Sequence, residues 1–128
     1  EAVNESAVQA LCHLVAQGHR ENQVLARNAG GIEVVITALE HHVHSEALQK
    51  IAASALGSLV YSDCESQKRA SRAMGIEAIV STLNTHRDSE EVQEHAVEAL
   101  RQLLADNRQN QTLAGAAGAA SAVVAMLK

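Results

Sequence analysis

Residues 21–60 read ENQVLARNAGGIEVVITALEHHVHSEALQKIAASALGSLV and contain one complete unit of a repeating pattern. The last part of the unit, Ser45–Val60, places apolar residues three and four positions apart, which predicts a long amphipathic helix. The middle part, Ile32–Leu39, is nearly all apolar and predicts a buried helix. A short helix is expected before it, near Glu21–Asn28. The glycine pair at residues 30–31 predicts a tight turn between these two helices.

The same pattern recurs along the chain at a step of 44 residues. The step relates a glutamine in the short segment and a leucine at the end of the apolar segment in three successive units: Gln23, Gln67 and Gln111, then Leu39, Leu83 and Leu127. Further long helices are expected at 5–16 and 89–105, and further short helices near 65–73 and 109–116. Such a period indicates stacked helical units, and stacking is required because no unit can bury its apolar face alone.

Composition supports closely packed helices and excludes several classes of protein. The 128 residues are 47% hydrophobic but include one aromatic residue and no proline, which disfavours a β-sandwich. A net charge of -5 argues against a nucleic-acid partner. No apolar run has the length of about 20 residues that spans a bilayer, so no membrane partner is expected. Cys12 and Cys64 lack paired spacing, which favours free thiols in an intracellular compartment, the cytoplasm or the nucleus.

The unit at residues 21–60 resembles the armadillo repeat family. That family has a short helix, an Ala-Gly-Gly-Ile corner, a buried second helix and a long third helix ending in Ala-Leu-x-x-Leu, and the resemblance covers essentially the whole chain. HEAT repeats are the main rival. The resemblance implies an all-α fold, a right-handed α-solenoid of armadillo-type three-helix repeats. The consensus proline after the corner is missing, because its positions hold Glu33, Glu77 and Ser121.

In the phase of the armadillo family, residues 1–128 form a single segment with incomplete repeats at both ends. A partial repeat at 1–16 precedes full repeats at 17–61 and 62–105, and a second partial repeat occupies 106–128. The last of these ends in an apolar helix that no polar helix follows. We therefore expect the chain to be a fragment of a longer protein.

The resemblance also implies a binding groove. The third helices of this family line a concave face, where importin-α-like members carry a Trp and, four residues later, an Asn. The corresponding positions here hold neither residue, so the resemblance implies a polar groove for a peptide or helix of a partner protein and no recognition of import signals. Those positions are Gln9, His13, Ser54, Ser58, Glu98 and Gln102.

Charged residues mark the same long helices. Glu91, Glu94 and Glu98 share one helix face at i, i+3 and i+7. This acidic stripe is either a dock for Lys or Arg side chains of a partner or simply a solvated face. Lys50, one turn before Ser54, is expected to make the middle of the groove basic.

No residue pattern indicates catalysis, a cofactor or a defined metal site. The chain has no G-x-S-x-G, no phosphate-binding glycine loop and no HExxH, so we expect a protein that is not an enzyme. His41, His42 and His44 are followed by His86 one repeat later. Histidine is a common zinc ligand, but these residues also fit the pattern of exposed loop residues.

Three functions fit the sequence. The first is an adaptor or scaffold that binds a protein segment in the polar groove. The second is a regulatory or autoinhibitory segment of a larger enzyme, of the kinase or ubiquitin ligase type. The third is self-association through the apolar helices at the two ends of the array.

Overall fold

The computed structural model describes residues 2–128, apart from the side chains of residues 2–4 and of residue 17. Over these residues the chain is all-helical, as the sequence predicts. A short 3-10 turn, η1 (Ala16–Gly18), follows the first helix. The α-helices are α1 (Ala2–Leu14), α2 (Arg20–Asn28), α3 (Gly31–His41), α4 (Glu46–Val60), α5 (Cys64–Arg72), α6 (Gly75–Thr85), α7 (Glu90–Leu104), α8 (Arg108–Ala116) and α9 (Ala119–Met126).

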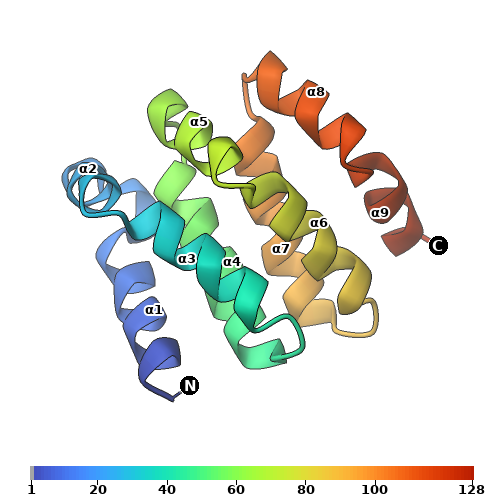
Figure 1. The fold of residues 1–128 in the computed structure, drawn as a ribbon, viewed down its shortest axis with the longest axis horizontal. Coiled ribbons are helices and arrows are strands. Elements are labelled where there is room, and N and C mark those ends of the chain that lie inside the picture. The colour runs from blue at the N-terminus through green and yellow to red at the C-terminus, as the bar shows by residue number, and fades with distance from the viewer. Residues whose placement is uncertain (1) are drawn as a thin grey trace.

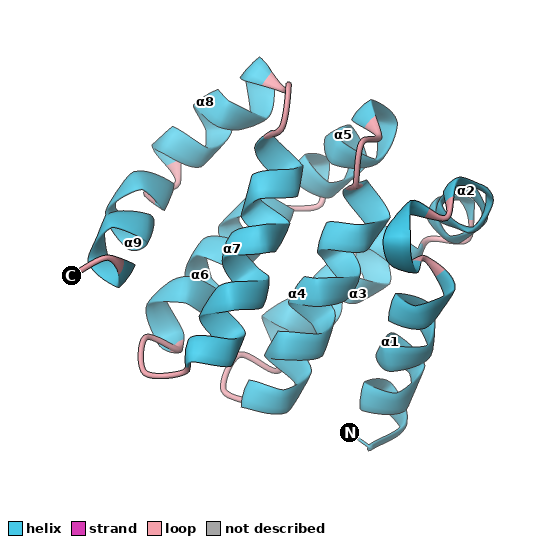
Figure 2. Ribbon diagram, turned by 180° about the vertical axis from the view of Figure 1, so that it is seen from behind, coloured by secondary structure: helices cyan, strands magenta, loops and turns pink. Residues whose placement is uncertain are grey.

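The helices form two layers. The long helices α1, α4 and α7 lie side by side in one layer, and α3, α6 and α9 form the second layer (Figure 1 and Figure 2). The short helices α2, α5 and α8 run along one edge. Equivalent helices within the long-helix layer and within the second layer are therefore neighbours in space. The predicted helices are all present, with their ends shifted by no more than about one turn.

Serine side chains cap the N-terminal ends of the long helices α4 and α7. Ser45 Oγ accepts a hydrogen bond from Leu48 N at 3.3 Å, and Ser89 Oγ accepts one from Val92 N at 3.3 Å. Each bond satisfies one of the backbone N–H groups that a helix leaves free in its first turn. Equivalent caps fix where α4 and α7 begin, and hence which of their residues share a face.

In each unit, the turn between the short helix and the buried helix contains a residue with left-handed backbone conformation. Gly30 and Gly118 both have φ 87°, and Met74 takes the same place in the middle unit with φ 70°. The glycine of the middle unit, Gly75, lies one residue later, at the start of α6, and is small for a different reason. A Cβ on Gly75 would lie 2.8 Å from Ala70 O and 2.9 Å from Ile36 Cδ1.

The core between the layers is made of aliphatic and alanine side chains. Leu56 and Leu103 from the long helices and Ile36 and Ile79 from the second layer are buried. Alanines such as Ala99 are also fully buried and let neighbouring long helices approach closely. The core thus runs continuously through successive units.

Buried glutamine amides connect helices that are distant in sequence. Gln23 Nε2 donates to Ser58 O at 2.7 Å and to Tyr61 O at 3.0 Å. Gln67 Nε2 makes the equivalent bonds, to Gln102 O at 2.7 Å and to Ala105 O at 3.0 Å. These acceptors belong to the last turns of α4 and α7, whose carbonyls have no partner within their own helix. The first and third helices of a unit are thereby joined.

Gly75 provides a test of the close packing at the corner. Replacing it with alanine should lower the free energy of unfolding by about 1–3 kcal/mol, because the new methyl group meets the Ala70 carbonyl and Ile36. The matched control is Gly115→Ala in α8, where a Cβ meets nothing within 4 Å. That variant should gain roughly 0.5 kcal/mol from helix propensity. Urea denaturation measures both, and equal effects of the two substitutions would contradict the packing described here.

Candidate functional site

The predicted groove residues all lie on the three long helices, and none of them is buried. Because α1, α4 and α7 are neighbours, these side chains share one surface, which we name the long-helix face (Figure 2). The residues on this face are Gln9 and His13 from α1, Lys50, Ser54 and Ser58 from α4, and Glu91, Glu94, Glu98 and Gln102 from α7.

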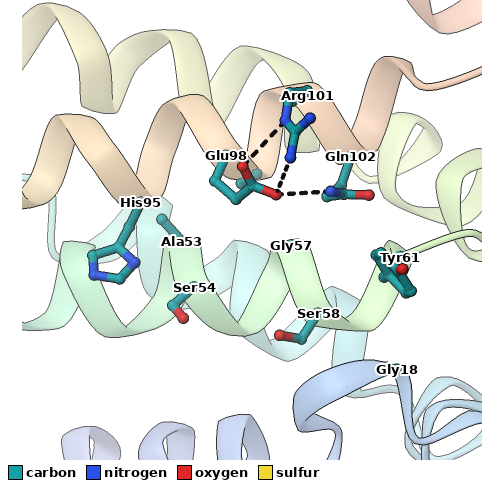
Figure 3. Close-up of a pocket in the computed structure, with 11 residues that line it drawn as sticks. Gly18, Ala53, Ser54, Gly57, Ser58, Tyr61, His95, Glu98, Arg101 and Gln102 are labelled. Atoms are coloured by element: carbon teal, nitrogen blue, oxygen red, sulfur yellow. Dashed lines mark hydrogen bonds and ion pairs between the residues drawn. The ribbon is translucent and has the colours of Figure 1, made fainter.

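Two adjacent hollows lie on the long-helix face. The larger, of about 380 Å³, lies between α4 and α7 (Figure 3). The smaller, of about 160 Å³, lies between α1 and α4. Ser54 and His95 line both hollows, so the two lie next to each other, and we name them together the groove. Of the predicted residues, Glu91 and Glu94 lie outside its lining.

Small residues form the floor of the larger hollow. Ala53, Gly57 and Ala99 line it and are buried. A Cβ on Gly57 would lie 3.3 Å from the Ala99 Cα, so the absence of a side chain lets α4 and α7 approach closely. Longer polar side chains on both sides then stand above a recessed floor. The hollow is therefore a direct consequence of the glycine and alanine positions in the repeat.

Glu98 is held in a network on the α7 side of the groove (Figure 3). Its carboxylate accepts hydrogen bonds from Arg101 at 3.1 and 3.2 Å and from Gln102 Nε2 at 2.7 Å. The bonds from Arg101, with that from Gln102, lower the pKa of Glu98 below its ordinary value. The same contact raises the pKa of Arg101. Glu98 therefore enters any recognition event as an anion already bound by its neighbours.

The rest of the acidic stripe is also partly neutralised. Lys50 Nζ from α4 lies 3.3 Å from Glu91 Oε1 on α7, an exposed ion pair that joins the two helices. Exposed pairs of this kind contribute only about 0–1 kcal/mol to stability. Glu94 is exposed and makes no ion pair or hydrogen bond within residues 2–128. The stripe thus offers one unpaired carboxylate, that of Glu94.

Several residues that line the groove were not predicted as site residues. His95, which the sequence does not distinguish from a packing residue, lines both hollows. Tyr61 and Gly18 close one end of the larger hollow, where a Cβ on Gly18 would lie 3.1 Å from the Tyr61 ring. Cys12 Sγ lies 3.5 Å from Ser54 Oγ in the smaller hollow. The i, i+3 spacing of Glu98 and Arg101 is the sequence feature from which the contact between them could have been predicted.

The histidines near the ends of α3 and α6 do not form a metal site in this geometry. His86 Nε2 lies 2.7 Å from the Val43 backbone oxygen and so connects two successive loops. No group of three His, Cys, Asp or Glu side chains among the described residues is placed to hold a metal ion. Cys12 and Cys64 are both free, the first half-buried and the second exposed.

None of the helices in the described part of the chain is both long enough and apolar enough to cross a bilayer.

Comparison with known families gives a match that covers more than half of the chain. Residues 48–124 match the family described as the Spinocerebellar ataxia type 10 protein domain. The chain belongs to this family. No curated protein and no solved structure matches this chain.

The family match corrects the resemblance drawn from the sequence. Assignment to the armadillo repeat family is wrong, since the family that matches is the spinocerebellar ataxia type 10 domain. The pattern behind the resemblance, alanines and leucines at a step of 44 residues, reflects what stacked helices need in order to pack. Features tied to the armadillo family itself, such as the consensus proline replaced by Glu33 and Glu77, are missing here.

The Glu98 network makes a prediction about pH. Arg101→Met removes the principal hydrogen-bond donor, so the pKa of Glu98 should rise toward that of an ordinary glutamate. Because folding depresses this pKa, the network stabilises the domain above the pKa of the unfolded carboxyl. That contribution is lost as the pH falls through the folded pKa. NMR titration of the Glu98 carboxyl measures the shift, with Arg108→Met on α8 as the control. An unchanged Glu98 titration in Arg101→Met would contradict the assigned cause.

Proposed function

We propose that this domain is a protein-interaction module that holds a segment of a partner protein in the groove. The observation that carries the proposal is that the two hollows lie side by side across α1, α4 and α7 and share Ser54 and His95 in their lining. The hydroxyl groups of Ser58 and Tyr61 and the ring of His95 form no hydrogen bond within the described residues. These groups are free to bind a ligand.

The lining favours an extended partner segment over a helix. Helices dock into grooves through apolar anchors, whereas extended segments bind through main-chain hydrogen bonds. The floor of the larger hollow is buried and small, and polar side chains stand on both sides of it. The smaller hollow also contains the half-buried Ile51, and of the exposed large hydrophobic side chains in the described residues only Tyr61 lines the groove. Ser54 and Ser58 are four residues apart on α4, about 6 Å along its axis. Two residues of an extended chain span about 6.5 Å, so both hydroxyls can reach the same edge of one segment.

We further propose that the helices belong to a right-handed α-solenoid. The hydrogen bonds of two buried glutamines support this proposal. The side-chain amides of Gln23 and Gln67 bind backbone carbonyls at the same sequence offsets in successive units. A solenoid presents its repeated helices as an extended binding surface. Binding is the proposed role in preference to catalysis, and the two free cysteines fit an intracellular protein.

Ser58→Arg tests the groove, because an arginine at this position fills the larger hollow without adding a residue to the buried core. Proteins retained from a cell lysate by the wild-type domain should be lost from Ser58→Arg and kept by the control Ser81→Arg. Ser81 is also exposed on a helix, but it lies on α6 in the other layer. Quantitative mass spectrometry of the three captured sets gives the comparison.

Two outcomes of this capture experiment contradict the proposal. If Ser58→Arg, shown by circular dichroism to be folded, keeps the same partners as the wild-type domain, the groove is not the binding site. Partners lost from both arginine variants would point to a general effect of added charge, and the groove would again have no special role.

A further inference from the structure

The side chains that line the groove have the opposite balance of charge from the chain as a whole. The chain has 10 Lys and Arg residues against 15 Asp and Glu residues, so its net charge is -5. Among the described residues that line the two hollows, Lys50 and Arg101 supply positive charges and Glu98 supplies the one negative charge. The groove is therefore a basic strip on an acidic domain.

The smaller hollow brings together hydrogen-bond donors and contains no carboxylate within the described residues. An ammonium group, two imidazole rings and a carboxamide line it, those of Lys50, His13, His95 and Gln9. Each of these groups can donate a hydrogen bond. In the part of the chain that the structure describes, the two imidazoles and the carboxamide of Gln9 make no hydrogen bond or ion pair. The hollow thus offers several donors to a ligand that supplies acceptors.

Lys50 keeps part of its binding capacity although it contacts Glu91. Its Nζ lies 3.3 Å from Glu91 Oε1, and the Glu91 side chain is 72% exposed. An ammonium group has three N–H donors, and this contact uses one of them. An exposed ion pair of this kind also exchanges easily, because solvent weakens the attraction between its members. Lys50 can therefore bind a carboxylate that enters the smaller hollow, either beside Glu91 or in its place.

The carboxylates that would be needed to bind a basic segment are occupied or lie outside the groove. Glu98 is already bound by two neighbours on its own helix. Glu91 is paired with Lys50, and neither Glu91 nor Glu94 lines either hollow. A Lys or Arg side chain of a partner would have to break the hydrogen bonds of Glu98. An acidic side chain, in contrast, meets donors that have no partner.

We propose that the segment held in the groove is acidic and places an Asp or Glu carboxylate over the smaller hollow, against Lys50. This inference rests on the proposed function, because it names the chemistry of the segment that the groove binds. A carboxylate suits the hollow better than a phosphate group does. Phosphate recognition uses clusters of arginine, whereas the described lining of the smaller hollow has a single permanent cation, Lys50.

The position of Lys50 along α4 fixes where the acidic residue lies in the segment. Figure 3 shows Ser54 and His95 toward one end of the larger hollow and Tyr61 at the other, so the smaller hollow adjoins the end at Ser54. Residues 50 and 58 are eight positions apart, about 12 Å along the helix axis. About four residues of an extended chain span this distance. The acidic residue should therefore lie about four residues from the residue that faces Ser58.

A library of short random peptides displayed on phage provides the probe. Peptides that bind in the groove are those that bind the wild-type domain but not Ser58→Trp, which fills the larger hollow without adding charge. These peptides should carry Asp or Glu at a fixed position. Their affinity, measured by fluorescence polarisation, should fall roughly fivefold in Lys50→Gln. It should rise roughly twofold in Glu91→Gln, because that substitution removes the competing carboxylate.

Matched controls make the same changes of charge away from the groove. Lys68→Gln and Glu65→Gln alter exposed residues of α5, neither of which lines either hollow, and both variants should bind the peptides as the wild-type domain does. Circular dichroism verifies that every variant is folded before its affinity is compared.

The possible results separate this inference from the proposed function. Groove-bound peptides that are neutral or basic, or that bind Lys50→Gln as well as the wild-type domain, would overturn the inference and leave the groove as a binding site. Equal losses of affinity in Lys50→Gln and Lys68→Gln would also overturn it, because the preference would then come from the net charge of the domain. A library that yields no peptide lost from Ser58→Trp would overturn both, since the groove would then hold no short segment.

Discussion

Buried glutamine side chains donate hydrogen bonds to the backbone carbonyls at the C-terminal ends of other helices. A helix leaves its last carbonyl groups without partners, and a carbonyl that is buried in this way costs about 1–3 kcal/mol. Gln23 and Gln67 bind such carbonyls at the ends of α4 and α7, and Gln49 Nε2 binds Leu39 O and His42 O at the end of α3. Thr82 Oγ1 donates to Gln49 Oε1, and Asn107 Nδ2 donates to Gln67 Oε1. Each unit is thus joined both within itself and to the next.

The groove depends on this constraint. Because α4 and α7 are fixed at both ends by equivalent contacts, residues four apart on one helix face their equivalents on the other. Gly57 and Ala99 then set a small separation, and the polar side chains of Ser58 and Gln102 remain on either side of a recessed floor (Figure 3). One packing rule therefore accounts for the proposed binding groove.

The sequence predicts the helices, because they follow from apolar spacing and the 44-residue step, whereas the position of the groove was implied by the family resemblance. It places Ser54, Ser58, Glu98 and Gln102 on one face, and the structure brings them together at the larger hollow. It does not predict the binding of Glu98 by Arg101 or of Glu91 by Lys50, which depends on the conformations of long side chains. The sequence also does not predict that Gln49 is buried and binds carbonyls at the end of α3, since one glutamine in an amphipathic helix has the pattern of a surface residue. The predicted family was wrong because the requirements of stacking dominate the sequence pattern.

The most direct test of this account compares two glutamines in the same column of the repeat. Gln67 is buried and bonded to Gln102 O and Ala105 O, whereas Gln111 is exposed and donates to Leu104 O alone. Urea unfolding should show that Gln67→Ala lowers the free energy of unfolding by about 2–4 kcal/mol, because it leaves buried groups without partners. Gln111→Ala should change it by no more than about 0.5 kcal/mol. Equal effects of the two substitutions, or a negligible effect of Gln67→Ala, would contradict the claim that buried amides hold the helices in place.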